Sequence, residues 1–182
     1  MHKGLDLAVE AFLQMPELHL HIVGGGAESD PFFARVYGSD VSKARNISIH
    51  GFLDVRSREF HDLCEGCAAL MYPSGSEGCS GGAVQCLHHG LIPLVTPIVG
   101  LEVHTRWPTL SGDTDALLIA DIRQRCREIA AMPERQLEEW RRFFWEFARR
   151  HHTREAYSQS LSYVLAELLD GERAGGNVER HP

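Results

Sequence analysis

The sequence predicts an α/β fold, a Rossmann-like parallel sheet with helices on both faces, followed by a helical C-terminal segment. Short apolar segments alternate with helix-like segments over most of the chain, which is the pattern of βαβ units and of a sheet covered on both faces. Glycine or proline follows several of the apolar segments. From Asp121 onward, three helical patterns follow one another without a strand between them.

The spacing of apolar residues predicts each element in turn. Residues 5–13 place Leu5, Ala8, Val9 and Phe12 at helical spacing before Pro16, which cannot continue a helix. Further helices are expected over residues 31–44, with an interruption near Gly38, and over 55–65, 81–89, 121–131, 134–150 and 153–170. Alternating or continuous apolar runs predict strands over residues 18–24, 46–52, 67–73, 91–96 and 116–120, and residues 107–114 are rich in turn formers.

The bulk composition describes one ordinary domain. Of the 182 residues, 43% are hydrophobic, which is enough for a sizeable core. We expect this domain to cover residues 1–170 and the remainder, 171–182, to be a disordered tail, since it lacks periodicity. Because the chain enters a helical pattern at once, with no strand before it, we expect it to be a domain of a longer, truncated protein.

Charge and targeting signals narrow the function classes. The formal net charge of −7 argues against nucleic-acid binding, which needs a basic surface. No apolar run approaches the length of a membrane span, and the N-terminus lacks the apolar core of a signal peptide. The five cysteines are an odd number scattered through apolar segments, so we interpret them as reduced thiols of a cytoplasmic protein.

The stretch SEGCSGGAVQCLHHG, residues 76–90, admits three interpretations. A serine nucleophile elbow at Ser80 needs a sharp turn directly from strand to helix, but the predicted strand ends near Tyr72. A metal or redox site is disfavoured because adjacent histidines point to different sides of a helix, and the CxxC of residues 64–67 stands alone. The third interpretation is a loop-to-helix joint that binds a ligand, and we favour it.

The residue types at this joint suit a nucleotide sugar. Gly78, Gly81 and Gly82 precede a helix, whose N-terminus offers unpaired N–H groups and the positive end of the dipole to a diphosphate. Glu77 would be repelled by phosphate, but its carboxylate can accept hydrogen bonds from two neighbouring hydroxyls. The glycines 24–26 after the first strand also expose amides, although the full G-x-G-x-x-G is absent. The alternative for Glu77 is a solvated helix cap.

Residues 141–152, RRFFWEFARRHH, interleave arginine with aromatic side chains. They could face anionic lipid or a partner domain. We favour an amphipathic helix that turns Phe143, Phe144 and Phe147 toward a core.

Taken in order, the segments KGLDLAVEAF, LHIVGGG, ISIHGFL, AALMYPSGSEG and AVQCLHHGLIPLVTPIVGLEV resemble the C-terminal, donor-binding domain of GT-B type glycosyltransferases. The likeness is greatest to glycosyltransferase family 4, also called glycosyl transferases group 1, and covers about residues 2–170. It implies a retaining hexosyltransferase that uses a UDP-, GDP- or ADP-sugar as donor substrate without a cofactor or a metal. The resemblance also implies an N-terminal acceptor-binding domain, absent from this sequence, without which the fragment should be inactive.

The resemblance assigns roles position by position. Lys3 matches the lysine that contacts the donor diphosphate. Glu77 matches the first acid of the family's E-x7-E motif, which contacts the transferred sugar. We take these two residues as catalytic. The implied binding residues are Gly24 and Gly25 after the first strand, Phe52 and Leu53 at the nucleobase, Ser80, Gly81 and Gly82 at the sugar and phosphate, and Gln85 at the ribose.

Gln85 departs from the family pattern, which has a second glutamate there. Glutamine can still serve one ribose hydroxyl as acceptor and the other as donor, but it loses the assistance of charge, a loss of about 1 kcal/mol. This departure, together with the absence of an arginine upstream of Lys3, motivates an alternative function, a non-catalytic glycosyltransferase-like partner module. A serine hydrolase using Ser80 and a nucleotide-sugar epimerase of the same fold are further alternatives. We expect a cytoplasmic location, with peripheral association of the parent protein at the inner face of the membrane as one possibility.

Overall fold

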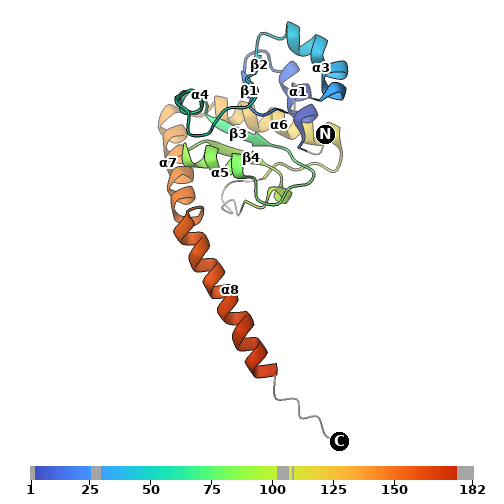
Figure 1. Ribbon diagram of the computed structural model, residues 1–182. Coiled ribbons are helices and arrows are strands. Elements are labelled where there is room, and N and C mark those ends of the chain that lie inside the picture. Colours follow the sequence, from blue (N-terminus) through green and yellow to red (C-terminus); the bar gives the residue numbers. More distant parts are fainter. Residues whose placement is uncertain (1–2, 26–29, 102–106, 108, 176–182) are drawn as a thin grey trace, which may run out of the picture.

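The computed structural model describes residues 3–25, 30–101, 107 and 109–175 (Figure 1). Its helices and strands follow one another in the order that the sequence analysis predicts up to β4. They are α1 (Leu5–Leu13), β1 (Leu20–Ile22), α3 (Pro31–Lys43), β2 (Ile47–Ile49), α4 (Arg58–Glu65), β3 (Ala69–Tyr72), α5 (Gly81–His88), β4 (Ile92–Val95), the 3-10 turn η1 (Pro97–Val99), α6 (Asp115–Ala130), α7 (Glu134–His151) and α8 (Arg154–Gly175).

The strands form two parallel pairs. In the first pair Leu20 of β1 lies opposite Ile47 of β2, and in the second Tyr72 of β3 lies opposite Val95 of β4. Parallel pairing requires a crossover between consecutive strands, and α3 and α5 provide it. The predicted α/β class with parallel strands is therefore confirmed.

Helices cover the strands from two sides (Figure 1). Helix α1 packs on α3 and α6, whereas α5 packs on α7 and on β3 and β4. The side chains of β4 are all buried, as expected for a parallel strand that is covered on both faces. The core between these layers contains Val9, Ile92, Leu94, Ile122 and Phe144, each almost fully buried.

The turn between α1 and β1 is held by one amide. The Nδ2 of Asn46 donates to the carbonyl oxygens of Phe12 (2.9 Å), Met15 (3.1 Å) and Leu18 (3.0 Å). These carbonyls lie where α1 ends and the chain turns into β1, so a single side chain at the start of β2 ties the first helix to the first strand pair.

Residues 116–120 are helical, and the prediction of a strand there is wrong. They open α6, whose first turn is capped by the Thr114 hydroxyl, which accepts from the N–H of Leu117 at 3.3 Å. Leu118 and Ile119 begin a helical stripe that continues through Ile122, Cys126 and Ile129, all packed in the core. The short apolar run is therefore the first turn of a longer amphipathic helix, a distinction that a five-residue window cannot make.

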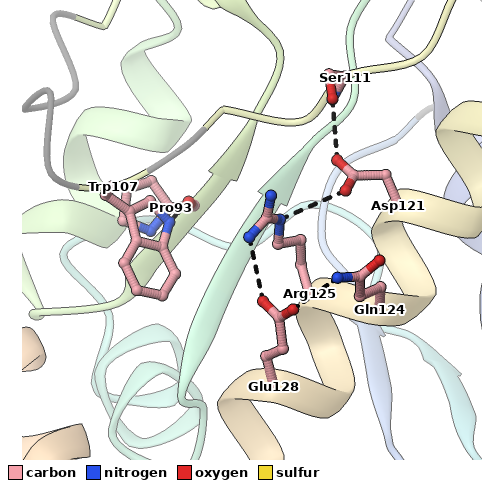
Figure 2. A network of polar contacts seen from close by, with 7 residues as sticks. All are labelled: Pro93, Trp107, Ser111, Asp121, Gln124, Arg125 and Glu128. Carbon is pink, nitrogen blue, oxygen red and sulfur yellow. Dashed lines mark hydrogen bonds and ion pairs between the residues drawn. The ribbon is translucent and has the colours of Figure 1, made fainter.

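A polar network holds α6 to the preceding loop (Figure 2). Asp121 accepts from the N–H of Ser111 at 2.9 Å and pairs with Arg125 at 3.4 Å; Arg125 in turn pairs with Glu128 at 3.2 Å. Nearby, the indole of Trp107 donates to the carbonyl of Pro93 in β4 at 2.7 Å. Two residues of the turn-rich segment are therefore held in place, Trp107 by β4 and Ser111 by α6.

Two other boundaries differ from the prediction. Helix α3 runs through Gly38 without interruption. Asp30 caps its start by accepting from the N–H groups of Phe32 (2.8 Å) and Phe33 (3.3 Å), and Pro31 occupies its first position. Helix α8 continues to Gly175, so residues 171–175 belong to it rather than to the predicted tail. Residues 176–182 lie outside the described residues.

Helix α8 extends away from the other elements (Figure 1), packing on α7 where it begins. Its exposed apolar side chains are Tyr157, Leu161, Tyr163, Val164, Leu165, Leu168 and Leu169. In α7, Phe144 is fully buried in the core and Phe143 packs against it, as expected, whereas the half-buried Phe147 packs against His151 and His152. Among the described residues, no helix combines the length and apolar character needed to cross a bilayer.

Candidate functional site

The carboxyl ends of the strands are tied together in pairs. Beyond β1, the N–H of Gly24 donates to the carbonyl of Gly51, which follows β2, at 2.6 Å. Beyond β4, the hydroxyl of Thr96 donates to the carbonyl of Ser74, which follows β3, also at 2.6 Å. In parallel sheets this edge is where ligands bind, so the loops that carry the predicted site residues are held in place by contacts between strand ends.

Gly4 places the start of α1 against the end of β3. Its φ of +70° lies in the left-handed region, and a Cβ built on it would overlap the carbonyl oxygen of Pro73. Only glycine fits this close approach without strain. The hydroxyl of Ser74 also donates to the carbonyl of Lys3 at 3.4 Å, so the main chain of Lys3 and Gly4 lies directly on the loop that leads to α5.

Lys3 and Glu77, separated by 74 positions in the sequence, form an ion pair. The Glu77 side chain is 13% exposed and the Lys3 side chain 48% exposed. The contact neutralises a carboxylate that has lost most of its access to water. It also brings the two residues that the sequence analysis takes as catalytic into direct contact.

The start of α5 lies next to this ion pair in the chain. Ser80 is buried, and its hydroxyl accepts from the N–H of Ala83 at 3.3 Å, which caps the helix. Cβ atoms built on Gly78 and Gly81 would stand in open space, whereas one on Gly82 would overlap the Tyr72 hydroxyl. Gly78 and Gly81 could therefore accept a side chain or a ligand at this position, whereas Gly82 is packed against Tyr72.

Tyr72, the last residue of β3, was missed by the sequence analysis. Burial raises the pKa of its phenol, as do the neighbouring Cys86 and Glu77, whereas hydrogen bonding to Ser80 and the charge of Lys3 lower it. Its hydroxyl lies where a Cβ on Gly82 would stand, beside the start of α5.

Ser74 and Thr96 were also missed. Together with Ser80 they are the buried polar side chains of the described structure, and all three lie at the carboxyl edge of β3 and β4. The sequence offered one indication, a polar residue shortly after an apolar strand. That pattern predicts a buried polar side chain only when it is known that the two strands pair.

The remaining predicted residues lie at the other strand pair or farther along α5. Gly24 and Gly25 follow β1, and Gly24 has a φ of +125°. Phe52, 83% exposed, and the half-buried Leu53 follow β2. Gln85 is half-buried on α5. The structure thus brings Lys3, Glu77 and residues 80–82 together at β3, and Gly24 together with the segment that leads to Phe52 at β2.

The competing interpretations of residues 76–90 find little geometric support. Strand β3 ends at Tyr72, and residues 73–79 separate it from Ser80, whose hydroxyl caps a helix; a nucleophile elbow needs a direct turn. Cys64 is buried at the end of α4 and Cys67 is half-buried before β3. Within the described part of the chain, no three His, Cys, Asp or Glu side chains are grouped so that they could hold a metal ion.

Comparison with known proteins finds similar folds among solved structures. No protein-family model matches the sequence, and no curated protein matches it. Among solved structures, a GtfA/B complex has a TM-score of 0.70 and 21% sequence identity to this chain. The match covers 93% of this chain and 34% of the other chain. The lipopolysaccharide glycosyltransferase WaaG matches 86% (TM-score 0.57, 17% identity, 41% of its chain).

A third structure, the pneumococcal O-GlcNAc transferase GtfA in complex with UDP and GlcNAc, matches 92% of this chain with a TM-score of 0.58 and 18% identity. Here the match covers 34% of the other chain, so this sequence spans well under half the length of each structure. At these identities the comparison establishes the fold, and it confirms the predicted GT-B architecture.

Proposed function

We propose that this chain, whose fold is that of GT-B glycosyltransferases, is the donor-binding domain of a retaining glycosyltransferase that moves a hexose from a nucleoside diphosphate sugar. The observation that carries the proposal is the ion pair of Lys3 and Glu77 beside the start of α5. A cation for a diphosphate and an acid for sugar hydroxyls stand in contact, at the edge of the sheet where α/β proteins bind ligands.

The contact between the two side chains matches the chemistry of the donor. In a nucleoside diphosphate sugar, the hexose is bonded directly to the β-phosphate. Glu77 would accept hydrogen bonds from hydroxyls of the hexose, and Lys3 would bind the adjacent phosphate. The bond that breaks joins these two groups, so the pair would orient the sugar and stabilise the negative charge that develops on the leaving diphosphate. Lys3 also neutralises Glu77, which would otherwise repel that diphosphate.

The main chain at the start of α5 would supply the remaining phosphate contacts. Ser80, Gly81 and Gly82 lie at the positive end of the helix dipole, and the Cβ position of Gly81 faces open space. A diphosphate held by amides needs few cations, which suits a chain of net charge −7. Neither a metal nor a cofactor enters this proposal.

Gln85 and the strand ends of β1 and β2 would bind the nucleoside. Gln85, on α5, would bind the ribose hydroxyls through its amide. Gly24, Gly25, Phe52 and Leu53 would form the nucleobase side, where the exposed ring of Phe52 is available for stacking. A solved structure of the same fold contains UDP and GlcNAc, so UDP and its sugars are the first donors to test, ahead of GDP- and ADP-sugars.

The domain would work as part of a longer protein. The chain spans only 34% to 41% of the matched structures, and α8 presents a row of exposed apolar side chains along a helix that stands apart from the other elements (Figure 1). We propose that a second, acceptor-binding domain completes the enzyme and that the isolated fragment transfers little sugar. We further propose a cytoplasmic parent protein that associates peripherally with a membrane; the exposed Trp145, with the Arg149 guanidinium 4.3 Å from its ring centre, suits a lipid surface.

Isothermal titration tests the assignment. The wild-type domain should bind UDP, GDP or ADP, or one of their sugars, at micromolar to millimolar concentration. Lys3→Ala should weaken the nucleoside diphosphate and the sugar nucleotide alike, whereas Glu77→Ala should weaken only the sugar nucleotide, because only the hexose contacts Glu77. If no nucleotide binds at millimolar concentration, the proposed function is wrong. If binding is unaffected by both variants, the site lies elsewhere.

A non-catalytic partner module is the second candidate function, and Gln85 is the observation that favours it. Gln85→Glu separates the two. A gain of about fivefold or more in nucleotide affinity would mean that a donor site has decayed, since the lost assistance of charge is worth about 1 kcal/mol. No gain would mean that the site is adapted to glutamine.

A further inference from the structure

Tyr72 lies against Gly82, one of the residues assigned to the donor, although none of those assignments includes Tyr72 itself. It ends β3, and its main-chain carbonyl accepts from the N–H of Thr96 at 3.3 Å, which continues the pairing with β4. Its side chain is half-buried, and its phenolic oxygen lies where a Cβ on Gly82 would stand. One side chain of β3 therefore reaches the first turn of α5.

The contact between Tyr72 and Gly82 is specific to the hydroxyl. A Cβ built on Gly82 would overlap the phenolic oxygen, but it would stand 3.5 Å from the ring carbon that carries this oxygen, an ordinary van der Waals distance. The oxygen thus occupies the space that a side chain at position 82 would need. A glycine at 82 and a tyrosine at 72 form a complementary pair.

We infer that Tyr72 is a positioning residue whose hydroxyl sets the Ser80–Gly82 main chain at the start of α5. The inference rests on the proposed function for the ligand that this main chain would bind, though the contact itself does not. The Ser80 hydroxyl accepts from the N–H of Ala83, and the Tyr72 hydroxyl lies against the main chain at Gly82. The N–H groups of the first turn are thereby fixed before a ligand arrives, which lowers the cost of binding an anion there.

Tyr72→Phe tests the role, because it removes the oxygen and keeps the ring. We expect UDP to bind about two- to tenfold more weakly, the value of one net hydrogen bond, with little change in the melting temperature. Tyr37→Phe is the matched control: this half-buried tyrosine donates to Glu10 at 2.6 Å, at the α1–α3 contact, so its variant should bind UDP as the wild type does.

The complementarity with Gly82 gives a second, ligand-independent test. Gly82→Ala should lower the melting temperature by about 2 to 10 °C because it overpacks the site. In a Tyr72→Phe background the same change should cost much less, since the overlapping oxygen is gone. Gly81→Ala, whose Cβ stands in open space, controls for helix propensity and should raise the melting temperature by about 1 to 3 °C.

Amide hydrogen exchange separates failure of this inference from failure of the proposed function. Tyr72→Phe should accelerate exchange of the Ala83 amide by at least about threefold, whether or not a nucleotide binds. If the wild type binds no nucleotide but this acceleration and the rescue of Gly82→Ala are seen, the proposed function fails and the positioning role stands. Unchanged exchange, the absence of rescue, or an unchanged affinity of Tyr72→Phe for a UDP that the wild type does bind would each overturn the inference.

Discussion

Replacing Gly4 with alanine probes how the start of α1 is held against the end of β3. Gly4 is buried and has a φ of +70°, and a Cβ there would overlap the carbonyl oxygen of Pro73. The change adds one methyl group and no charge. It therefore acts through the conformation of Gly4, its contact with Pro73 and the position of the neighbouring Lys3.

Two costs add up. An alanine in the left-handed region costs about 1 kcal/mol relative to glycine. Overpacking a methyl group against main chain costs about 1 to 3 kcal/mol more. We therefore expect Gly4→Ala to lower the free energy of unfolding by about 3 kcal/mol, which for a chain of this length lowers the melting temperature by about 6 to 12 °C. If the clash is relieved by a shift of Lys3 away from Glu77, UDP should bind about tenfold more weakly or worse, since a charge-assisted contact is lost.

Thermal unfolding followed by circular dichroism, together with UDP titration, measures both effects. Gly38→Ala is the control: Gly38 lies inside α3 with nothing near its Cβ position, so the same substitution should stabilise the protein by about 0.5 to 1 kcal/mol. The reasoning is refuted if Gly4→Ala melts within 1 °C of the wild type and binds UDP equally well, because neither the strained φ nor the close approach would then exist.

Three further predictions concern the fold and its titrating groups. Asn46→Ala should cost about 2 kcal/mol, since one amide bonds three carbonyls; urea unfolding should show a lower midpoint with an unchanged slope. Burial, then the charges of His19 and His50, lower the pKa of His21 below 6.5. As the pH drops from 7 toward 5, His21 is therefore protonated more readily in the unfolded chain than in the folded one, and the free energy of unfolding should fall. His21→Gln should flatten this pH dependence, and a variant with an unchanged pH profile would contradict the prediction. Exposed Cys79 should react with a thiol reagent in the folded protein, whereas Cys126, buried and with its pKa raised to about 12, should react only on unfolding; equal rates would contradict the burial.

The candidate site was predictable to the extent that it follows strand ends. Glycine after an apolar strand, and an acid with glycines before a helix, are local signals, and from them we selected Gly24, Glu77 and the glycines 78, 81 and 82 as candidates. The contact of Lys3 with Glu77 is not local, because 74 positions separate the two residues. From residue types alone, Lys3 is an ordinary surface lysine; its assignment came from the family resemblance, and the structure places it beside the acid.

Tyr72, Ser74 and Thr96 show what residue types alone do not reveal. Each belongs to or directly follows an apolar strand, where a polar atom is unremarkable if the chain is exposed. Only the pairing of β3 with β4 buries Ser74 and Thr96 and bonds the one to the other. Burying a polar group without a hydrogen-bond partner costs free energy. The hydrogen bond between Thr96 and Ser74 therefore depends on the packing of β3 against β4, and neither segment alone predicts it.

The sequence by itself determined the α/β class, the order of the elements from α1 to β4 and the helices α7 and α8, because hydrophobic periodicity and turn-forming residues act over a few positions. It did not determine whether residues 116–120 form a strand or a helix, since five apolar residues suit both; packing of the longer stripe of α6 on α1 decided that. Tertiary structure alone decided which loops meet. The close approach of Gly4 to Pro73, the pairing of Lys3 with Glu77 and the fit of Tyr72 to Gly82 all join segments far apart in the chain, and such contacts form only when the strands and helices that carry them pack together.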